Sequence, residues 1–354
     1  MLRKGTFILM KTKIQDMTSG SPGRLIILFA IPLMLGNICQ QLYTMVDTMV
    51  VGQVAGVEAL AALGAVDFLM WVVTGISTGL TQGFSIQLSQ YYGAKDFENL
   101  RKSLAHSYRL TAFIAAGVLI LSQSFASLVL TGLHTPSNII GMSLLYLRII
   151  FCGIPATAAY NMFASALRAM GNSKTPLTAM IIASVLNVSL DILFVAGFGW
   201  GVAGAAIATV IAQSFSAVYC FLILRRIDIV HLTRADFMPA SGMNARLMKL
   251  GIPVVFQNII IGVGGLVVQY VINGYGFLFV AGFTATNKLY GLLEMAAISY
   301  GYAIVTYVGQ NLGAGKIDRI RKGVRSSMLL SLLTSLIISI AMFLFGKNIL
   351  SLFI

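Results

Sequence analysis

Long apolar runs alternate with short polar stretches along almost the whole chain. A helix needs about 20 predominantly apolar residues to cross the hydrocarbon layer of a bilayer. Nine stretches approach or exceed that length: 25–51, 60–88, 110–130, 139–166, 177–198, 202–224, 252–272, 277–308 and 328–345. This pattern predicts an all-α polytopic membrane protein with nine spanning helices.

The composition supports a bilayer as the solvent. Hydrophobic residues make up 58% of the 354 residues and charged residues only 10%, which an ordinary water-soluble domain cannot place on its surface. The apolar run from Phe7 to Met10 is too short for the hydrophobic region of a secretory signal, so we expect the first span to direct insertion. The three cysteines lie in separate apolar runs, without the spacing of a metal or disulfide set.

The net charge of +13 raises the question of nucleic-acid binding, but the positions of the basic residues argue against it. With the N-terminus in the cytoplasm, every second connection carries several of them: Lys95, Arg101, Lys102 and Arg109; Arg168 and Lys174; Arg225, Arg226, Arg234, Arg246 and Lys249; Lys316, Arg319, Arg321, Lys322 and Arg325. The opposite connections, 52–57, 132–138, 197–201 and 273–276, contain neither Lys nor Arg. This positive-inside asymmetry predicts a plasma (inner) membrane protein with a cytoplasmic N-terminus and no nucleic-acid partner.

An internal repeat recurs at a shift of about 220 residues. The segment RLIILFAIPLMLGNI from Arg24 resembles RLMKLGIPVVFQNI from Arg246, and SQYYGAKDFENLRK parallels GQNLGAGKIDRIRK, which ends at Lys322. Six spans separate the copies, so both face the membrane in the same direction. The repeat divides the chain into a cytoplasmic segment 1–23, an N-lobe of six helices 24–225, a cytoplasmic linker 226–245 and a partial C-lobe of three helices 246–354. By this repeat roughly 90 residues of the second copy, matching 134–224, are missing. Either the chain is a truncated form of a twelve-helix protein, or its second lobe is unusually half-sized.

Ionisable residues at membrane depth are costly and therefore indicate function. Asp47 in the first span, Asp191 in the fifth and Thr209 in the sixth are predicted to lie at a similar depth, ~8 to 12 Å below the outer surface. Asn187 lies one helical turn from Asp191. These oxygen donors suit a hard cation such as Na⁺, and the carboxylates also suit a proton. The alternative is structural: Asp47 caps a broken helix, and Asp191 pairs with polar backbone in a kink.

Further polar and soft residues are candidates for a substrate cavity. They are Asn37, Gln40, Gln41, Tyr43 and Met45 on the first span, Gln257 and Asn258 on the seventh, and Glu294 on the eighth. Methionine and aromatic side chains suit amphipathic organic cations, although ordinary helix packing would use the same residue types. The roles of Asp67, Lys288 and Glu294 stay open at this point, and Arg148 is expected to extend to the outer interface.

Enzyme signatures are lacking in the sequence. It contains no Walker loop, no HExxH and no GxSxG, and its histidines are His106, His134 and His231. We therefore expect a protein that is not an enzyme and has no cofactor. Without an ATP-binding motif, an ion gradient is the natural energy source.

Five segments resemble the multidrug and toxic compound extrusion (MATE) family: DMTSGSPGRL, IPLMLGNICQQLYTMVDTMVVGQ, GLTQGFSIQLSQYYGAKD, LRAMGNSKTP and LNVSLDILF. The resemblance implies twelve helices in two lobes and the export of cationic, amphipathic compounds in exchange for H⁺ or Na⁺. It also implies that Asp47, Asn187, Asp191 and Thr209 form the cation site of the first lobe. The seventh-span segment PVVFQNIIIG lacks the glutamate that some members use, so a second-lobe cation site is not supported.

Taken together, the sequence predicts a cation-coupled antiporter for multidrug efflux that acts as a monomer. Two alternatives stay open. One is a flippase for lipid-linked sugars, which would need a strongly cationic cavity. The other is an inactive fragment of a longer transporter, because alternating access needs one lobe to move against another. A membrane-embedded enzyme or receptor is a more distant alternative. Neither the substrate nor the choice between H⁺ and Na⁺ can be read from the chain.

Overall fold

All nine predicted stretches are helical in the computed structural model, which describes residues 14–132, 135–273 and 277–350. The long helices are α1 (Pro22–Val54), α3 (Asp67–Gly93), α4 (Phe97–Gly132), α7 (Lys174–Asp191), α8 (Gly201–Leu224), α9 (Met243–Asn273), α10 (Phe277–Gly313) and α11 (Ile317–Leu350). Shorter ones are α2 (Val57–Gly64), α5 (Ile140–Cys152), α6 (Ile154–Ala169) and the π-helical turn η1 (Ile192–Gly197). Two 3₁₀ turns, η2 (Asp228–Val230) and η3 (Arg234–Phe237), lie between α8 and α9.

Two of the nine predicted stretches are each divided into two helices. The span 139–166 divides into α5 and α6, which meet at Gly153 with a bend of 46°. Pro155 explains this break, because its ring and missing N–H are tolerated only in the first turn of a new helix. The span 60–88 divides into α2 and α3 at residues 65–66 without a proline.

Length and composition support the membrane assignment. Within the described residues, six helices are long and apolar enough to span a membrane, and the number rises to eight when each bent pair counts as one span. This all-helical, multi-pass architecture agrees with the predicted fold class. Large apolar side chains on the outside, such as Phe113 at 79% exposure and Phe343 at 91%, are typical of a surface that faces lipid.

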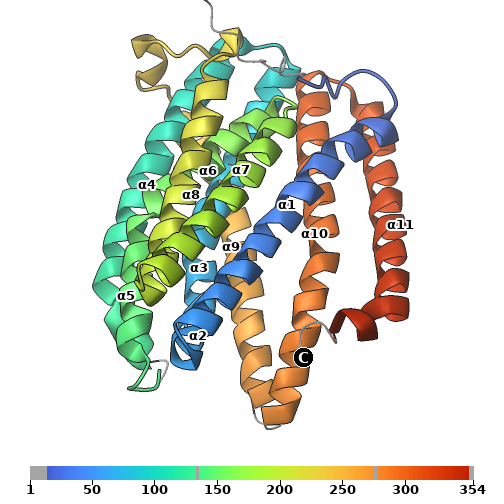
Figure 1. The fold of residues 1–354 in the computed structure, drawn as a ribbon. Helices are drawn as coiled ribbons and strands as arrows, with labels where there is room; N and C mark the ends of the chain where they lie inside the picture. The colour runs from blue at the N-terminus through green and yellow to red at the C-terminus, as the bar shows by residue number, and fades with distance from the viewer. Residues whose placement is uncertain (1–13, 133–134, 274–276, 351–354) are drawn as a thin grey trace, which may run out of the picture.

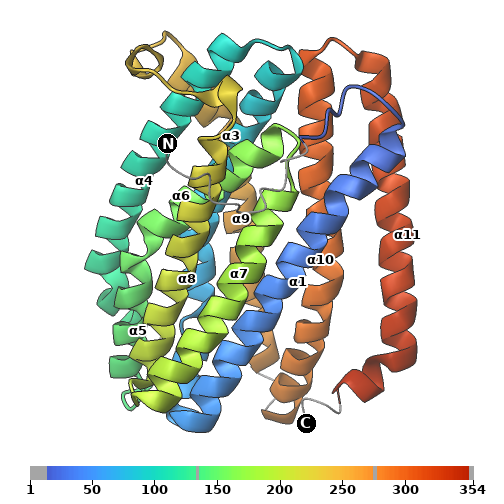
Figure 2. The same ribbon diagram turned by 45° about the horizontal axis from the view of Figure 1, so that its top comes forward.

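The helices run side by side along one bundle, and α1 crosses it diagonally (Figure 1 and Figure 2). α1 packs against α7 on one side and against α10 and α11 on the other. α3 lies inside the bundle, in contact with α4, α6, α9 and α10. α1 and α3 therefore both touch helices of the first and of the second sequence repeat.

Small residues allow the closest of these contacts. A Cβ on Gly83 of α3 would overlap the backbone of Gly251 on α9, and Gly79 lies against the backbone of Val255. Glycine at these positions lets the two backbones approach as membrane helices commonly do. This contact fixes α9 beside α3 and so positions the residues between them.

The apolar core of the first repeat has two parts, and polar residues lie between them. One cluster contains Phe84, Leu104 and Leu167 and gathers toward the basic end, while the other contains Val51, Leu147 and Val195. Asp47 stands on α1 between Tyr43, which packs on the first cluster, and Val51 of the second. The buried carboxylate therefore belongs to a polar layer between two apolar ones.

Candidate functional site

Asp47, Asn187 and Asp191 lie in the interior of the first repeat. Asp47 is 5% exposed, and Asn187 and Asp191 are fully buried. α1 supplies the first residue, and the last turns of α7 supply the other two, immediately before the π-helical turn η1. α1, α7 and η1 pack against one another. We call these three residues, together with Thr209 of α8, the acidic chamber.

Several oxygen atoms of the acidic chamber are buried without a hydrogen-bond donor. They are one carboxylate oxygen of Asp47, both carboxylate oxygens of Asp191 and the amide oxygen of Asn187, considering the part of the chain that the structure describes. Buried polar atoms are nearly always paired, because leaving one unpaired costs free energy. A cation coordinated by oxygen atoms, or a bound proton, would pair with these acceptors.

The acidic chamber has polar neighbours on several helices. The Asn187 amide Nδ2 donates to the Thr209 hydroxyl at 3.4 Å, and this bond leaves the amide oxygen available. Gln213 of α8 donates to the Tyr43 hydroxyl at 3.4 Å. The carboxyl groups of Asp47 and Asp191 are close enough to interact electrostatically.

Asp67, the first residue of α3, adds negative charge near the acidic chamber. It interacts electrostatically with Asp47, although the sequence left its role open. The break between α2 and α3 places it there, and the spacing of apolar residues did not reveal this break. Asp67 is exposed, in contrast to the buried pair.

The donor set of the acidic chamber fits a hard monovalent cation better than a transition metal. Two carboxylates, one amide and one hydroxyl are oxygen donors of the kind that hard cations prefer. Among the described residues, no three His, Cys, Asp or Glu side chains come together as metal ligands would. Protonation of the carboxylates would satisfy the same buried groups, so this geometry suits both H⁺ and Na⁺.

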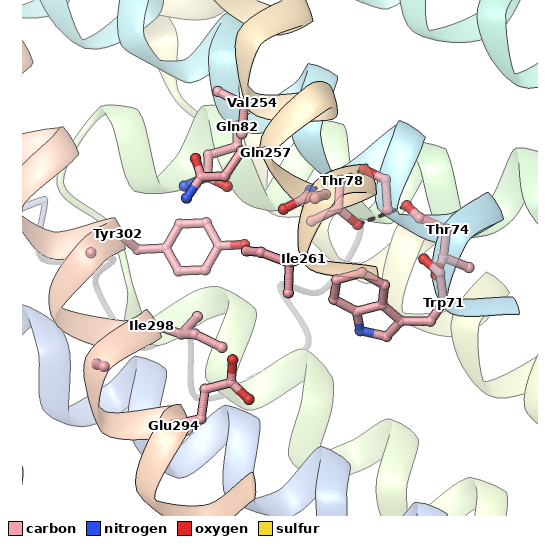
Figure 3. Close-up of a pocket in the computed structure, with 14 residues that line it drawn as sticks. Trp71, Thr74, Thr78, Gln82, Val254, Gln257, Ile261, Glu294, Ile298 and Tyr302 are labelled. Atoms are coloured by element: carbon pink, nitrogen blue, oxygen red, sulfur yellow. Dashed lines mark hydrogen bonds between the residues drawn. The ribbon is translucent and has the colours of Figure 1, made fainter. Parts of the chain in front are cut away.

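A separate cavity of about 680 Å³ lies between α3, α9 and α10. Of the eight residues predicted for a substrate cavity, Gln257, Asn258 and Glu294 line it. Glu294 and Tyr302 of α10 point into it across from Trp71 of α3 (Figure 3). We call this the central cavity, since helices of both sequence repeats enclose it.

The other five predicted cavity residues lie elsewhere on α1. Asn37, Gln40, Gln41, Tyr43 and Met45 are not part of the lining of the central cavity. Asn37 instead donates to the Ser299 hydroxyl of α10 at 3.2 Å, and Tyr43 faces Gln213. These contacts place α1 between the acidic chamber and α10. Lys288 lies outside the residues whose side chains the structure describes.

The contribution of α3 to the central cavity was not predicted from the sequence. Thr74, Thr78 and Gln82 line it and follow one another at intervals of four residues, which places them on one face of the helix. This polar stripe in an apolar span was visible in the sequence. Asn161 of α6 donates to the Thr78 hydroxyl at 3.2 Å, and Asn258 donates to the backbone carbonyl of Gly75 at 3.1 Å.

Aromatic and basic groups border the same cavity. The Arg168 guanidinium of α6 lies 4.7 Å from the centre of the Tyr302 ring. Among the residues whose side chains the structure describes, the lining of the central cavity contains one carboxylate, Glu294, and no Lys or Arg. The cavity is therefore suited to a ligand with positive charge and apolar surface.

Comparisons with known proteins point to one family. The sequence profile named MatE matches residues 32–193 and 253–354. The chain is 32% identical to the "Probable multidrug resistance protein YpnP" of Bacillus subtilis (strain 168), over 87% of this chain and 69% of that protein. It is 28% identical to the "Probable multidrug resistance protein YoeA" of the same organism, over 96% of this chain and 75% of that protein.

Solved structures share the fold. A MOP superfamily transporter from Pyrococcus furiosus, described under the heading "Reverse polarity of binding pocket suggests different function", superposes with a TM-score of 0.91 at 23% identity. That alignment covers 98% of this chain and 77% of the transporter. An outward-facing multidrug resistance MATE family transporter gives a TM-score of 0.90 at 23% identity, with the same coverage. The chain thus spans about three quarters of the length of these transporters.

Proposed function

This chain belongs to the multidrug and toxic compound extrusion family, whose profile MatE it matches, and we propose that it exports cationic, amphipathic compounds in exchange for H⁺ or Na⁺. Membership makes it a multi-pass efflux transporter and not an enzyme. The coupling ion, the substrate class and the residues that bind them are the parts that we propose.

The observation that carries the coupling proposal is the group of orphaned oxygen atoms in the acidic chamber. A cation bound by Asp47, Asp191, Asn187 and Thr209 would satisfy them, whereas an empty chamber would keep two carboxyl groups buried near each other. A cation can drive a conformational change only if it binds the two states with different affinity. We propose that cation binding favours the state in which α1 closes over the chamber.

α1 is the element that would transmit this change. It carries Asp47 inside the first repeat, and its Asn37 bonds to Ser299 of α10 in the second. A bend or rotation of α1 would therefore alter contacts with α10, a wall of the central cavity. Pro32, which lies inside α1, removes one helical hydrogen bond and makes such bending easier.

The central cavity is the proposed substrate site. Glu294 supplies negative charge, and Trp71 supplies an aromatic face that attracts organic cations. A flippase for lipid-linked sugars would need a strongly cationic cavity to bind the phosphates of its substrate. The described part of the lining has a carboxylate, Glu294, and no Lys or Arg, and this charge favours export of cations over that alternative.

We further propose that the basic end of the bundle faces the cytoplasm. The turns that follow α3 and α10 and the linker 226–245 lie at one end of the molecule (Figure 1). Basic connections are retained on the cytoplasmic side. The variants Lys95→Cys and Gly56→Cys, each treated with a membrane-impermeant thiol reagent, test this. Labelling of Lys95→Cys from outside intact cells would show that the orientation is the opposite one.

Efflux from vesicles tests the function. The full chain is reconstituted, loaded with a fluorescent organic cation such as ethidium, and given a proton gradient or a sodium gradient in separate experiments. We expect one gradient to drive transport in the unmodified protein and neither to do so in Asp47→Asn or Asp191→Asn. Asp318→Asn, which neutralises a carboxylate in the first turn of α11, serves as the matched control and should transport normally. Gradient-driven transport by either chamber variant would contradict the proposed site.

A further inference from the structure

Two adjoining hollows on the first repeat are not used by the transport proposal. One, of about 470 Å³, lies where α8 meets the linker and is lined by Tyr108, Phe221, Leu224, Arg225, Val230, His231, Leu232 and Phe237. The other, of about 380 Å³, runs between α4, α6 and α8 and shares Tyr108 and Phe221 with the first. The two hollows adjoin at these two side chains, and we call them together the linker groove.

The linker end of the groove is positively charged. Arg225 lies with its guanidinium 5.6 Å from the Phe221 ring centre, and Arg109 donates to the Phe237 carbonyl at 2.9 Å. His231 bonds to the carbonyl of Arg225 at 2.9 Å, which holds it against the same wall.

The acidic side chains of the linker do not offset this charge inside the groove. Asp236 accepts hydrogen bonds from the N–H and the hydroxyl of Thr233 and lies 3.7 Å from Arg101. Asp228 is exposed and is not part of the lining of either hollow. Arg225, at the border of a membrane span, therefore lines this pocket, and Arg109 lies beside it through its bond to the Phe237 carbonyl. Among the described residues, no carboxylate is part of this lining.

The membrane end of the groove is apolar. Small residues, among them Ala112 and Ala116 of α4 and Ala159 of α6, line it together with Pro155. Along α4 the groove extends from Tyr108 to Leu119, which at 1.5 Å per residue is about 16 Å. This length matches half of the ~30 Å hydrocarbon layer.

Aromatic rings mark the junction between the two ends. The rings of Tyr108 and Phe163 meet edge to face at 5.3 Å, and those of Phe163 and Phe221 lie 5.2 Å apart. Tyrosine, here Tyr108, is a residue type that gathers where the hydrocarbon layer meets the headgroups. The position of these rings separates a charged headgroup region from a hydrocarbon region.

We propose that the linker groove binds an anionic phospholipid, with its phosphate at Arg109 and Arg225 and one acyl chain along α4. Guanidinium groups form bidentate bonds to phosphate, and basic pockets between membrane helices on one side of a bilayer hold anionic headgroups. The bound lipid would connect the linker between the repeats to α4, α6 and α8. This site is separate from the acidic chamber and from the central cavity, so it stands whether or not the proposed coupling is correct.

Native mass spectrometry of the full chain in detergent tests the site. Delipidated protein is titrated with phosphatidylglycerol or with phosphatidylcholine of the same acyl chains. We expect phosphatidylglycerol to bind about tenfold more tightly. The double variant Arg109→Gln, Arg225→Gln should lose this preference. The control Arg321→Gln, Lys322→Gln removes the same charge at the same end of the bundle and should keep it.

Two further measurements make the result decisive. Ala116→Phe fills the apolar part of the groove without changing charge, and we expect it to weaken binding of phosphatidylglycerol by several-fold. Inorganic phosphate at millimolar concentration should not displace the lipid. Equal affinity for both lipids, an equal loss in the control variant, unchanged binding in Ala116→Phe, or displacement by inorganic phosphate would each overturn the proposal.

Discussion

Gly93 at the end of α3 lies directly against the backbone carbonyl of Gln310 on α10, so closely that a Cβ at position 93 would overlap this oxygen. The same relationship holds in reverse, because a Cβ on Gly313 would overlap the carbonyl oxygen of Gln90. These four residues are equivalent positions of the two sequence repeats. The repeats therefore meet face to face at the basic end, and α3 and α10 must separate there before that end can open.

Gly313→Ala should destabilise the protein. The added methyl group has no room beside the Gln90 carbonyl, and overpacking of this kind costs about 1 to 3 kcal/mol. Thermal unfolding of the purified protein in detergent should show a lower midpoint. Gly117→Ala on α4 is the matched control, since no atom lies within 4 Å of the added Cβ and alanine favours helix. If the unfolding midpoint of Gly313→Ala equals that of the control, the helices move apart at this contact without loss of stability.

Arg319 holds the segment before α1 onto the second repeat. Its guanidinium donates to the carbonyls of Gly20 at 2.9 Å and Met17 at 3.3 Å and to the Asn311 side chain at 3.0 Å. Met17 is fully buried, and its N–H donates to the Gln310 side chain at 3.0 Å.

Arg319→Ala should therefore release residues 14–21. The lost hydrogen bonds contribute about 0.5 to 1.5 kcal/mol each, so we expect amide hydrogen exchange at Met17 to be faster by at least about tenfold. Exchange measured by mass spectrometry on the peptide that contains Met17 checks this. Arg321→Ala, which removes an exposed arginine of the same helix, should leave the exchange rate unchanged. Equal rates in the two variants would mean that apolar burial of Met17 alone holds the segment.

Much of this fold follows from the sequence because bilayer thickness constrains it strongly. The nine apolar stretches, the repeat and the basic connections each depend on local composition, and the structure has a helix at every stretch. The similar depth of Asp47 and Asp191 follows from counting residues along helices of known rise. In the structure both residues are buried inside the first repeat, and their carboxyl groups interact electrostatically.

Features that depend on packing between distant segments could not be predicted in the same way. The break between α2 and α3 has no proline to mark it, and it is what brings Asp67 near Asp47. The central cavity arises because glycines let α9 approach α3, so its lining combines Trp71 and Thr78 with Glu294. The polar residues of α1 were grouped with this cavity because helix periodicity does not say which neighbour a face meets.

Substitutions of Thr209 can distinguish cation coordination from simple packing in the acidic chamber. Its hydroxyl accepts a bond from Asn187, whose own oxygen is unpaired. Thr209→Val keeps the shape and removes the oxygen, so we expect the half-saturating concentration of the coupling ion to rise about threefold to tenfold. Thr209→Ser, which keeps the hydroxyl, should behave like the unmodified protein. Initial efflux rates measured against ion concentration provide the test, and an equal effect in both variants would indicate a packing role.

Glu294 provides the sharpest test of substrate charge recognition in the central cavity. The other polar groups that line the cavity are neutral, so Glu294→Gln removes the negative charge while it keeps the size of the side chain. Charged and aromatic groups each contribute on the order of 1 kcal/mol to cation binding at partly exposed sites, which corresponds to about fivefold in affinity. We expect the KM for a permanently cationic dye to rise by about that factor, while the KM for a neutral substrate stays constant. Glu58→Gln, in the first turn of α2, is the matched control and should change neither value. If the KM of both substrates rises equally in Glu294→Gln, the residue shapes the cavity wall and does not recognise the charge of the substrate.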